Sequence, residues 1–326
     1  MIASSVALVV AFVCALIFGR YEVSFTALLG IIFGSGDYAI EESIIMNLRL
    51  PRTIIAALVG AALSVSGLLY QSIFRNKLVS PDLLGVSSGA GVGASLAIIL
   101  GLPAFFTGAF AFGFGVVTVI ATVVVSNVFK DRSSMSLPLA GIIVGGLMGS
   151  ILSFIKYAAD AETTLASITF WLMGSFENSV MKDALTLLPI VIVCLVVILL
   201  ISYRINVISL GQDEAETKGL NYNLYRLVII AIATLLTASS VAFSGTISWI
   251  GLAIPHIVRL IADTDDTTRT IPLSITFGAV FMVLSDILSR VFTASEIPIS
   301  AITGFFGTLV FIAIVYIRRS RVNESN

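Results

Sequence analysis

Charged residues are scarce in this sequence: Asp, Glu, Lys and Arg make up 11% of its 326 residues, whereas 58% are hydrophobic. An ordinary soluble domain carries about a quarter charged residues. A chain of this length exposes too much surface for a composition so poor in charge. The composition therefore excludes a water-soluble globular protein and predicts a membrane protein. The net charge of -1 gives no reason to expect a nucleic-acid partner.

Residues that commonly carry chemistry are also few. The chain has one histidine, His256, and two cysteines, Cys14 and Cys194, each within an apolar run. This excludes a His-rich metal site and a disulfide framework, and we expect both cysteines to be packing residues. The sequence has no Walker-type nucleotide loop, no HExxH and no GxSxG motif. We therefore expect no metal, no cofactor and no catalytic activity.

Long apolar runs are what the sequence has instead. A helix needs about 20 apolar residues to cross the hydrocarbon core. Ten runs approach this length, and they lie near 2–19, 53–73, 84–102, 107–129, 137–157, 185–203, 225–243, 246–262, 272–291 and 299–317. The first has no Lys or Arg before its apolar stretch and no clear cleavage site before Arg20, so it is expected to be a membrane span rather than a signal peptide.

Ten spans place both chain ends on one side of the membrane. The distribution of basic residues predicts which side that is. Twelve of the 18 Lys and Arg residues fall in one set of loops and at the C-terminus, and six fall in the other set. Loops rich in Lys and Arg face the cytoplasm. The sequence thus predicts a multi-pass protein of the bacterial inner membrane with cytoplasmic N- and C-termini.

Glycines recur every four residues in two of the runs. The two sets are Gly85, Gly89 and Gly93, and Gly141, Gly145 and Gly149. Small-residue faces of this kind let helix backbones approach closely in lipid. We expect close helix packing here, which is also compatible with helices that slide or tilt during transport.

No run contains the series of acidic residues that a proton or sodium relay would need. The ionisable groups within the runs are Lys156, His256, Arg259, Asp286 and Arg290, and most lie near a span end. A stand-alone secondary transporter or a channel would need coupling charges or a filter motif, and neither is visible. A transporter of this composition must take its energy from a partner.

One cytoplasmic segment has the features of a docking element. Residues 205–224, hereafter the coupling segment, lie within the longest predicted inner loop, Tyr203 to Tyr225. Gln212 to Lys218 are good helix formers, and Gly219 is a natural helix stop. A short amphipathic helix is therefore expected at the membrane surface. It is either a solvated connection or a docking element for a cytoplasmic motor.

Several motifs, in order along nearly the whole chain, resemble the FecCD permease family. They are Arg49-Leu-Pro-Arg52, Gly60 to Gln71, Asn76 to Gly91, Phe170-Trp-Leu-Met-Gly174-Ser-Phe, Leu210 to Leu220, Gly251 to Arg259, and Ser285 to Pro298. The resemblance implies an all-α, ten-helix membrane bundle forming a single domain over 1–326. It also implies the permease subunit of a type II ABC importer, related to the BtuC type.

The resemblance further implies the partners. Two permease subunits, as a homodimer or a related heterodimer, would enclose the pore within the lipid bilayer. Cytoplasmic ATP-binding subunits would hydrolyse ATP, and an extracytoplasmic substrate-binding protein would deliver the cargo. A ferric siderophore is the cargo most common in the family, while haem, cobalamin and oxyanions remain alternatives.

Individual roles follow from the same resemblance. Arg49, Arg52 and Arg290 match positions that pair with glutamates of the binding protein, and exposed charges would steer that docking. Head-group anchoring or internal pairing is the alternative, and Arg290 stands four residues after Asp286, which suits an intrahelical ion pair. The resemblance assigns ATPase coupling to Asp213, Glu214, Lys218, Gly219, Leu220, Asn221 and Tyr222.

The pore is expected to be built from small, weakly polar residues. Its predicted lining is Ser87, Ser88, Ser150, Ser153 and Thr303. Ser134 and Met135 are the candidates for the cytoplasmic gate, with a plain serine-capped turn before Pro138 as the alternative. The resemblance also implies a short helix within 169–182 at the pore mouth.

Overall fold

Each of the ten predicted apolar runs coincides with a helix in the computed structural model, which describes residues 2–34, 36, 38–129, 136–293 and 295–324. Within these residues the chain forms helices and no strands. In the first half these helices are α1 (Ile2–Ile17), α4 (Leu50–Ile73), α5 (Val86–Ile99), α6 (Ala104–Ser126) and α7 (Ser136–Ala158). In the second half they are α9 (Met181–Ser209), α11 (Tyr222–Ser244), α12 (Ile250–Ala262), α13 (Thr267–Val291) and α14 (Ile299–Glu324). Helices satisfy every backbone group internally, which lipid requires.

The ten helices differ in length. Six segments are long and apolar enough to span: 39–73, α6, α7, α9, α11 and α13. The apolar stretches of the other four are shorter, at Ile2–Ile17, Val86–Ile99, Ile250–Ala262 and Ile299–Ile314. By contrast, α5 has 14 residues and α12 has 13. Helices of that size are about 20 Å long, against about 30 Å of hydrocarbon. The predicted runs 84–102 and 246–262 are therefore longer than these helices, which begin inside the bundle.

Several shorter elements lie outside the ten runs. They are α2 (Phe25–Phe33), α3 (Ala39–Ile44), the π-helical turn η1 (Ile45–Arg49), the 3-10 turn η2 (Pro81–Leu84), α8 (Thr164–Met173) and α10 (Gln212–Thr217). α3 and η1 run directly into α4. The short helix expected within 169–182 is found earlier, as α8. These elements are too short or too polar to stand out as apolar runs.

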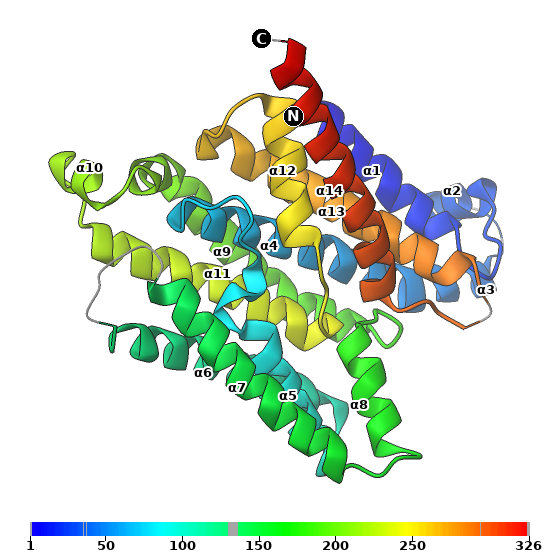
Figure 1. Cartoon of the computed structure of the whole chain (residues 1–326). Coiled ribbons are helices and arrows are strands. Elements are labelled where there is room, and N and C mark those ends of the chain that lie inside the picture. The colour runs from blue at the N-terminus through cyan, green and yellow to red at the C-terminus, as the bar shows by residue number, and fades with distance from the viewer. Residues whose placement is uncertain (1, 35, 37, 130–135, 294, 325–326) are drawn as a thin grey trace.

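Helix α4 lies at the centre of the bundle and packs against α9, α11, α12 and α13 (Figure 1). Its small residues explain this position. A Cβ atom on Gly67 would collide with the backbone carbonyl of Gly251 in α12, and one on Gly60 would collide with that of Gly278 in α13. Two helices therefore rest directly on the backbone of α4.

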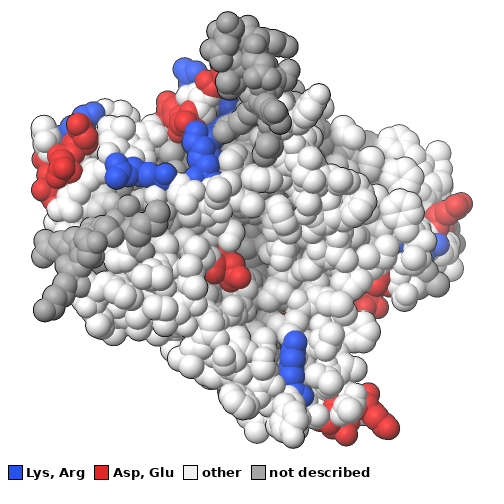
Figure 2. Space-filling view, viewed as in Figure 1, with Lys and Arg blue, Asp and Glu red and all other residues white. Residues whose placement is uncertain are grey.

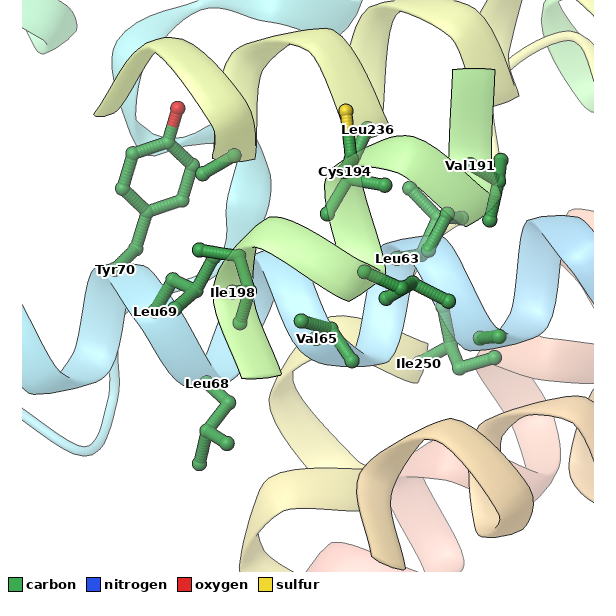
Figure 3. Packing of buried hydrophobic residues seen from close by; sticks show 14 of the residues in the cluster. Leu63, Val65, Leu68, Leu69, Tyr70, Val191, Cys194, Ile198, Leu236 and Ile250 are labelled. Atoms are coloured by element: carbon green, nitrogen blue, oxygen red, sulfur yellow. The ribbon is translucent and has the colours of Figure 1, made fainter. Parts of the chain in front are cut away.

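Larger apolar side chains of α4 fill the space on its other sides, where they meet α9 and α11 (Figure 3). Leu69 and Tyr70 of α4 are fully buried, as are Ile198 of α9 and Leu236 of α11. Cys194 is also buried in this cluster, and it is a free thiol. Its expected packing role is confirmed.

The two glycine faces are only partly used for packing. Cβ atoms on Gly89 and Gly93 of α5 would meet backbone or side-chain atoms of α6, and one on Gly141 of α7 would meet the carbonyl of Leu83. A Cβ atom on Gly149 would meet nothing within 4 Å. Close packing is therefore confirmed for α5 and for the N-terminal half of α7, and not for the rest of that face.

The surface is mostly uncharged, and both chain ends lie at the same end of the bundle (Figures 1 and 2). In Figure 2, charged side chains gather toward the edges of the visible face, and acidic side chains cluster at the corner formed by α10. Large apolar side chains such as Phe154, Leu200 and Phe292 are exposed. An exposed apolar surface of this extent suits contact with lipid.

Candidate functional site

A pocket of about 440 Å³ lies where α5 and α12 begin inside the bundle. Its wall includes Leu63 of α4, Leu152 of α7, Leu172 of α8, Thr237 of α11 and the segment 246–252. A second hollow of similar volume lies along α1 and is lined by Ile2, Ser5, Val6, Val9 and Val10. That hollow is an apolar surface that suits lipid, so the pocket between α5 and α12 is the candidate site.

The pocket is lined by hydroxyl groups and one carboxylate. The hydroxyls belong to Ser80, Ser87, Ser88, Thr237, Thr246 and Ser248. Asp82 is the one ionisable residue of this lining in the part of the chain that the structure describes. Its Oδ1 accepts a hydrogen bond from the Ser87 backbone N–H at 2.9 Å. Such a wall offers few strong contacts and suits passage of a bulky solute.

Of the predicted pore residues, the structure brings only two to this pocket. Ser87 and Ser88 line it. Ser150 and Ser153 lie on an exposed side of α7, where their hydroxyls donate to the carbonyls of Gly146 and Gly149. Thr303 is fully buried in the bundle. The pore-lining roles of Ser150, Ser153 and Thr303 stay predictions.

Sequence reasoning missed Asp82, although a signal was present. Asp82 follows Ser80-Pro81 and precedes Gly85, where the chain turns with φ of 80° into α5. Aspartate is a preferred residue just ahead of a helix because its carboxylate accepts backbone N–H groups of the first turn. The sequence pattern therefore indicated a helix cap. It did not indicate that Asp82 lines a pocket.

The three arginines expected to dock a binding protein are buried, with 4%, 6% and 5% of Arg49, Arg52 and Arg290 exposed. Two of them hold the end of α1. Arg49 donates to the carbonyls of Leu16, Ile17 and Tyr21. Arg290 donates to the carbonyl of Ala15 at 2.6 Å. Basic side chains at a helix C-terminus satisfy carbonyls that lack intrahelical partners.

Arg52 instead links α4 to α13 and to the segment that follows α13. Its Nε lies 2.6 Å from Asp286 Oδ1, and its Nη1 lies 2.6 Å from Glu296 Oε1. Nη2 donates to Ser289 Oγ at 3.1 Å. Asp286 also pairs with Arg290 across one helical turn, at 3.5 Å. We call Arg52, Asp286, Arg290 and Glu296 the outer ion network.

These contacts correct one premise of the docking prediction. Exposed guanidinium groups were expected, and in this chain they are buried against carbonyls and carboxylates. The internal ion pair of Arg290 with Asp286, which was the alternative, is present. Docking at these positions stays a prediction, and it would require a partner's carboxylate to reach groups that are already engaged.

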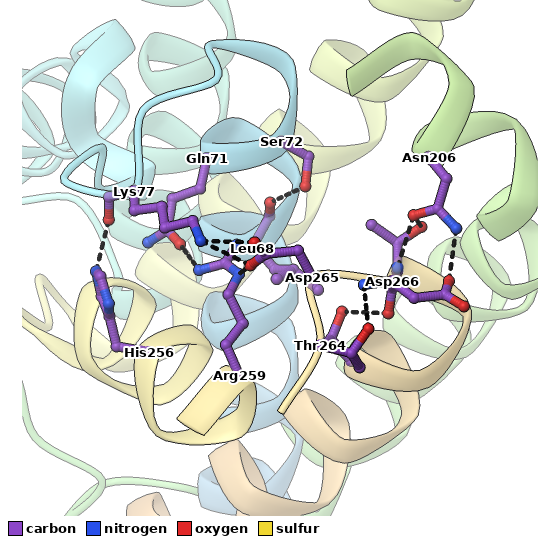
Figure 4. A network of polar contacts seen from close by, with 12 residues as sticks. Leu68, Gln71, Ser72, Lys77, Asn206, His256, Arg259, Thr264, Asp265 and Asp266 are labelled. Carbon is purple, nitrogen blue, oxygen red and sulfur yellow. Dashed lines mark hydrogen bonds and ion pairs between the residues drawn. The ribbon is translucent and has the colours of Figure 1, made fainter. Parts of the chain in front are cut away.

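A second polar network lies at the opposite end of α4 (Figure 4). Arg259 of α12 donates to Gln71 Oε1 at 2.6 Å and lies 3.2 Å from Asp265. Lys77 pairs with the same carboxylate at 2.7 Å. His256 Nε2 lies 2.7 Å from the carbonyl oxygen of Lys77. The histidine therefore has the structural hydrogen-bonding role expected of it.

The members of this network should differ in their effect on stability. Lys77 and Asp265 are 43% and 64% exposed, so replacing Lys77 by alanine should cost less than about 1 kcal/mol. Arg259 is buried against Gln71, so Arg259→Ala should cost about 2 kcal/mol. Thermal unfolding of the purified variants in detergent would measure both. Equal losses of stability in the two variants would contradict this expected difference.

The coupling segment folds as predicted. α10 spans Gln212–Thr217 and ends at Gly219, which has φ of 76°. The Gly219 N–H donates to the carbonyl of Glu216, and the Leu220 N–H donates to that of Ala215. This pair of bonds is a glycine-dependent helix stop. Asn221 then caps α11 by accepting from the Leu224 N–H at 3.0 Å.

The coupling segment presents a charged surface and two exposed leucines, Leu210 and Leu224. Asp213, Glu214, Lys218, Gly219 and Asn221 are exposed. Leu220 and Tyr222, expected to offer apolar contacts, are half-buried against the chain's own core. Leu224 is 55% exposed instead. Ser134 and Met135, the gate candidates, lie outside the described residues.

Comparison with known proteins places this arrangement in a family. A model of the FecCD transport family matches residues 7–317. The chain belongs to this family. The molybdate import system permease protein MolB of Haemophilus influenzae is 36% identical to this FecCD chain, over 97% of the chain and 95% of that protein. The cobalamin import system permease protein BtuC of Halobacterium salinarum is 34% identical, over 86% of the chain and 74% of that protein.

A solved structure agrees with the FecCD chain in three dimensions. It is described as an inward-facing conformation of a protein assigned to the metal-chelate type of ABC transporter. Its TM-score is 0.88 at 34% sequence identity, and the match covers 97% of the FecCD chain and 98% of that chain. The family and the helical permease fold predicted from the sequence are therefore confirmed.

The FecCD chain is a polytopic membrane permease subunit of an ABC importer. It is a transport component rather than a catalyst, and ATP hydrolysis lies with a partner subunit. Permeases of this class pair with an ATPase and a binding protein and form dimers. The cargo differs between relatives, one of which is named for molybdate and another for cobalamin.

Proposed function

We propose that the chain forms, with a second copy or a related subunit, the translocation pore for a ferric siderophore. The pocket between α5 and α12 carries this proposal. It is a hydroxyl-lined space at the start of two short helices, with volume for part of a chelate and few groups to hold it. Transporters commonly place their substrate path where helices are interrupted near the midplane.

The proposed orientation puts both termini and the coupling segment in the cytoplasm. The asymmetry of Lys and Arg between the two sets of loops supports it. The position of both chain ends at the same end of the bundle in Figure 1 is compatible with it. In this orientation the outer ion network faces the extracytoplasmic side, and the network around Arg259 faces the ATPase.

Uptake by the reconstituted importer tests the proposed function. The chain would be co-purified with its ATPase and binding protein and placed in proteoliposomes. ATP-dependent accumulation of an iron-55 siderophore complex is the expected result. Uptake of haem, cobalamin or molybdate in its place would support an ABC importer and would refute the ferric siderophore as its cargo. Uptake without ATP or partners would instead support a secondary transporter or a channel.

The coupling segment gives a separate prediction for the ATPase. Leu224→Glu places a charge where an exposed leucine would be buried by the motor. Burying a leucine is worth about 2 kcal/mol, so ATPase affinity should fall about 30-fold. Binding of the ATPase to permease in nanodiscs would measure this.

The matched control for this variant is Leu100→Glu. Leu100 is 63% exposed and lies in the connection between α5 and α6, outside the coupling segment. Its replacement should change ATPase affinity by less than about threefold, since an exposed site away from the contact contributes little. Equal losses in the two variants would refute docking at residues 205–224.

A further inference from the structure

The connection from α13 to α14 begins at the outer ion network. Residues 296–300, hereafter the α13–α14 linker, start with Glu296, whose Oε1 lies 2.6 Å from Arg52 Nη1. The Ile297 N–H donates to the carbonyl of Ser289 in α13 at 3.0 Å. One end of the linker is therefore held by an ion pair and by a backbone hydrogen bond.

The other end of the linker binds the pocket. We call the part of the pocket that it meets the outer wall, which consists of residues 172–175 and 244–248. The Ile299 N–H donates to the carbonyl of Gly174 at 3.0 Å, and Ser300 Oγ donates to that of Thr246 at 2.5 Å. Thr246 lines the pocket. In Figure 1 the linker reaches the start of α14 beside the segment that leads into α12.

The two segments of the outer wall are also bonded to each other. The Ser175 N–H donates to the carbonyl of Ser244 at 2.9 Å. The Thr246 hydroxyl donates to the carbonyl of Leu172, which also lines the pocket. A Cβ atom on Gly174 would lie only 2.6 Å from the carbonyl oxygen of Thr246, so the two backbones are in contact. A displacement of one segment must therefore affect the other.

The outer wall depends on such bonds because part of it has no regular structure. Residues 245–248 lie between α11 and α12 and belong to neither helix. Irregular backbone has no helical partners of its own, so its polar groups must be satisfied by neighbouring segments. The Ser300 hydroxyl does this for the carbonyl of Thr246. The position of the α13–α14 linker therefore helps to determine the position of the wall.

We propose that the α13–α14 linker couples the outer ion network to the outer wall of the pocket. Arg52 and Glu296 act as positioning residues: while they are paired, the linker holds Gly174 and Thr246 in the conformation described above. An acidic group that competes with Glu296 for Arg52 would release the linker and loosen the wall. The importance of this coupling for transport rests on the proposed function, in which the pocket is the path of the cargo.

Amide hydrogen exchange of the full chain in nanodiscs measures the coupling directly, because exchange reports local opening. Glu296→Gln keeps an oxygen acceptor for Arg52 and removes the charge. Arg52 retains Asp286 and Ser289 as partners, so the variant should fold. Exchange of the Ser175 N–H, which lies outside the linker, should become about fivefold faster, since a hydrogen bond to a charged group is stronger than one to a neutral group.

The matched control is Glu41→Gln. Glu41 is an exposed carboxylate of α3 that accepts a hydrogen bond from the Tyr21 hydroxyl at 3.3 Å, and it lies outside the linker. This control should leave the exchange rate of the Ser175 N–H within about 1.5-fold. The Leu220 N–H, which is bonded to the carbonyl of Ala215 in the coupling segment, should be unaffected in both variants.

A second variant breaks the coupling at the opposite end of the linker. Ser300→Ala removes the bond to Thr246 and leaves the ion pair of Arg52 with Glu296 intact. It should also make exchange of the Ser175 N–H about fivefold faster. In the combined variant with Glu296→Gln, the increase should be smaller than the product of the two separate increases, because the changes act through one connection.

Three outcomes would overturn the proposal. In the first, Glu296→Gln speeds exchange of the Ile299 N–H and leaves that of the Ser175 N–H unchanged, so the linker opens without the wall. In the second, the two increases multiply in the combined variant, so Glu296 acts by another route. In the third, the Leu220 N–H exchanges faster to the same extent, and the variant has destabilised the whole bundle.

Glu296→Asp tests the same ion pair if Glu296→Gln does not fold. It retains the charge and withdraws the carboxylate by one methylene, and the same increase for the Ser175 N–H is expected. The exchange experiment uses no cargo, ATPase or binding protein, so it fails independently of the uptake assay. Absence of ATP-dependent uptake would refute the proposed function whatever the exchange rates. Unchanged exchange of the Ser175 N–H would refute the coupling while the importer stands.

Discussion

Replacing Asp286 by alanine is expected to be among the most destabilising single changes in this protein. Asp286 is fully buried and pairs with both Arg52 and Arg290. Its removal leaves two guanidinium groups in the bundle without their shared carboxylate. Breaking a buried ion pair costs about 3–5 kcal/mol. Thermal unfolding in detergent should show a fall in Tm of about 6 °C.

Two comparisons make this result specific. Glu177→Ala removes an exposed carboxylate, and it should leave Tm within about 2 °C, as surface substitutions usually do. The double variant Arg52→Ala with Asp286→Ala should lose less than the sum of the single losses, because groups in contact are not additive. Additive losses would show that the outer ion network does not act as a unit.

Gly67→Ala should have the second large effect, although it adds a single methyl group. The new Cβ would overlap the carbonyl of Gly251, so α4 and α12 would have to separate. Backbone atoms cannot rotate away as a side chain does, and a cost of about 3 kcal/mol is expected, at the upper end for overpacking. Because α12 also lines the pocket, uptake should fall together with Tm.

The same substitution elsewhere provides the control. Gly146 lies within α7, and a Cβ atom there would meet nothing within 4 Å. Gly146→Ala should therefore raise stability by about 0.5–1 kcal/mol, because alanine favours a helix over glycine. Opposite signs for the two variants are the expected outcome. A Gly67→Ala protein as stable as Gly146→Ala would show that α12 does not rest on α4 in the membrane.

The helices themselves were largely predictable from the sequence. Apolar length identifies α6, α7, α9, α11 and α13, since composition alone requires each run to lie in lipid or in the core. It fails for α5 and α12, because an apolar run does not reveal where a backbone turns. Gly85 and Trp249, both with positive φ, mark those turns in the structure. A tryptophan gives no such signal in a sequence.

Charge was harder to interpret than hydrophobicity. The basic residues near 49–52 and 290 were expected to be exposed because the resemblance assigns them to docking of the binding protein. They are buried because their partners come from far along the chain: Arg52 meets Asp286, and Arg49 meets the carbonyls of Leu16 and Ile17. The pair at 286 and 290 was local enough to be suggested by spacing alone.

The pore residues show the same limit. A hydroxyl residue in a span can face a pocket, as Ser88 does, or lie on an exposed helix face, as Ser153 does, or be buried like Thr303. Composition does not distinguish these cases, because each hydroxyl can satisfy itself on the carbonyl one turn earlier. Only the arrangement of helices around the pocket separates them.

The anchoring of α1 has a consequence for how the protein is made. Helix α1 cannot complete its contacts until α13 has been synthesised. The carbonyl of Ala15 receives its hydrogen bond from Arg290, 275 residues later. Until then α1 has few partners, since it packs chiefly on α13. The contacts of α1 therefore form late in the biogenesis of this permease. Truncated chains that stop before α13 should leave α1 accessible to quality-control proteases.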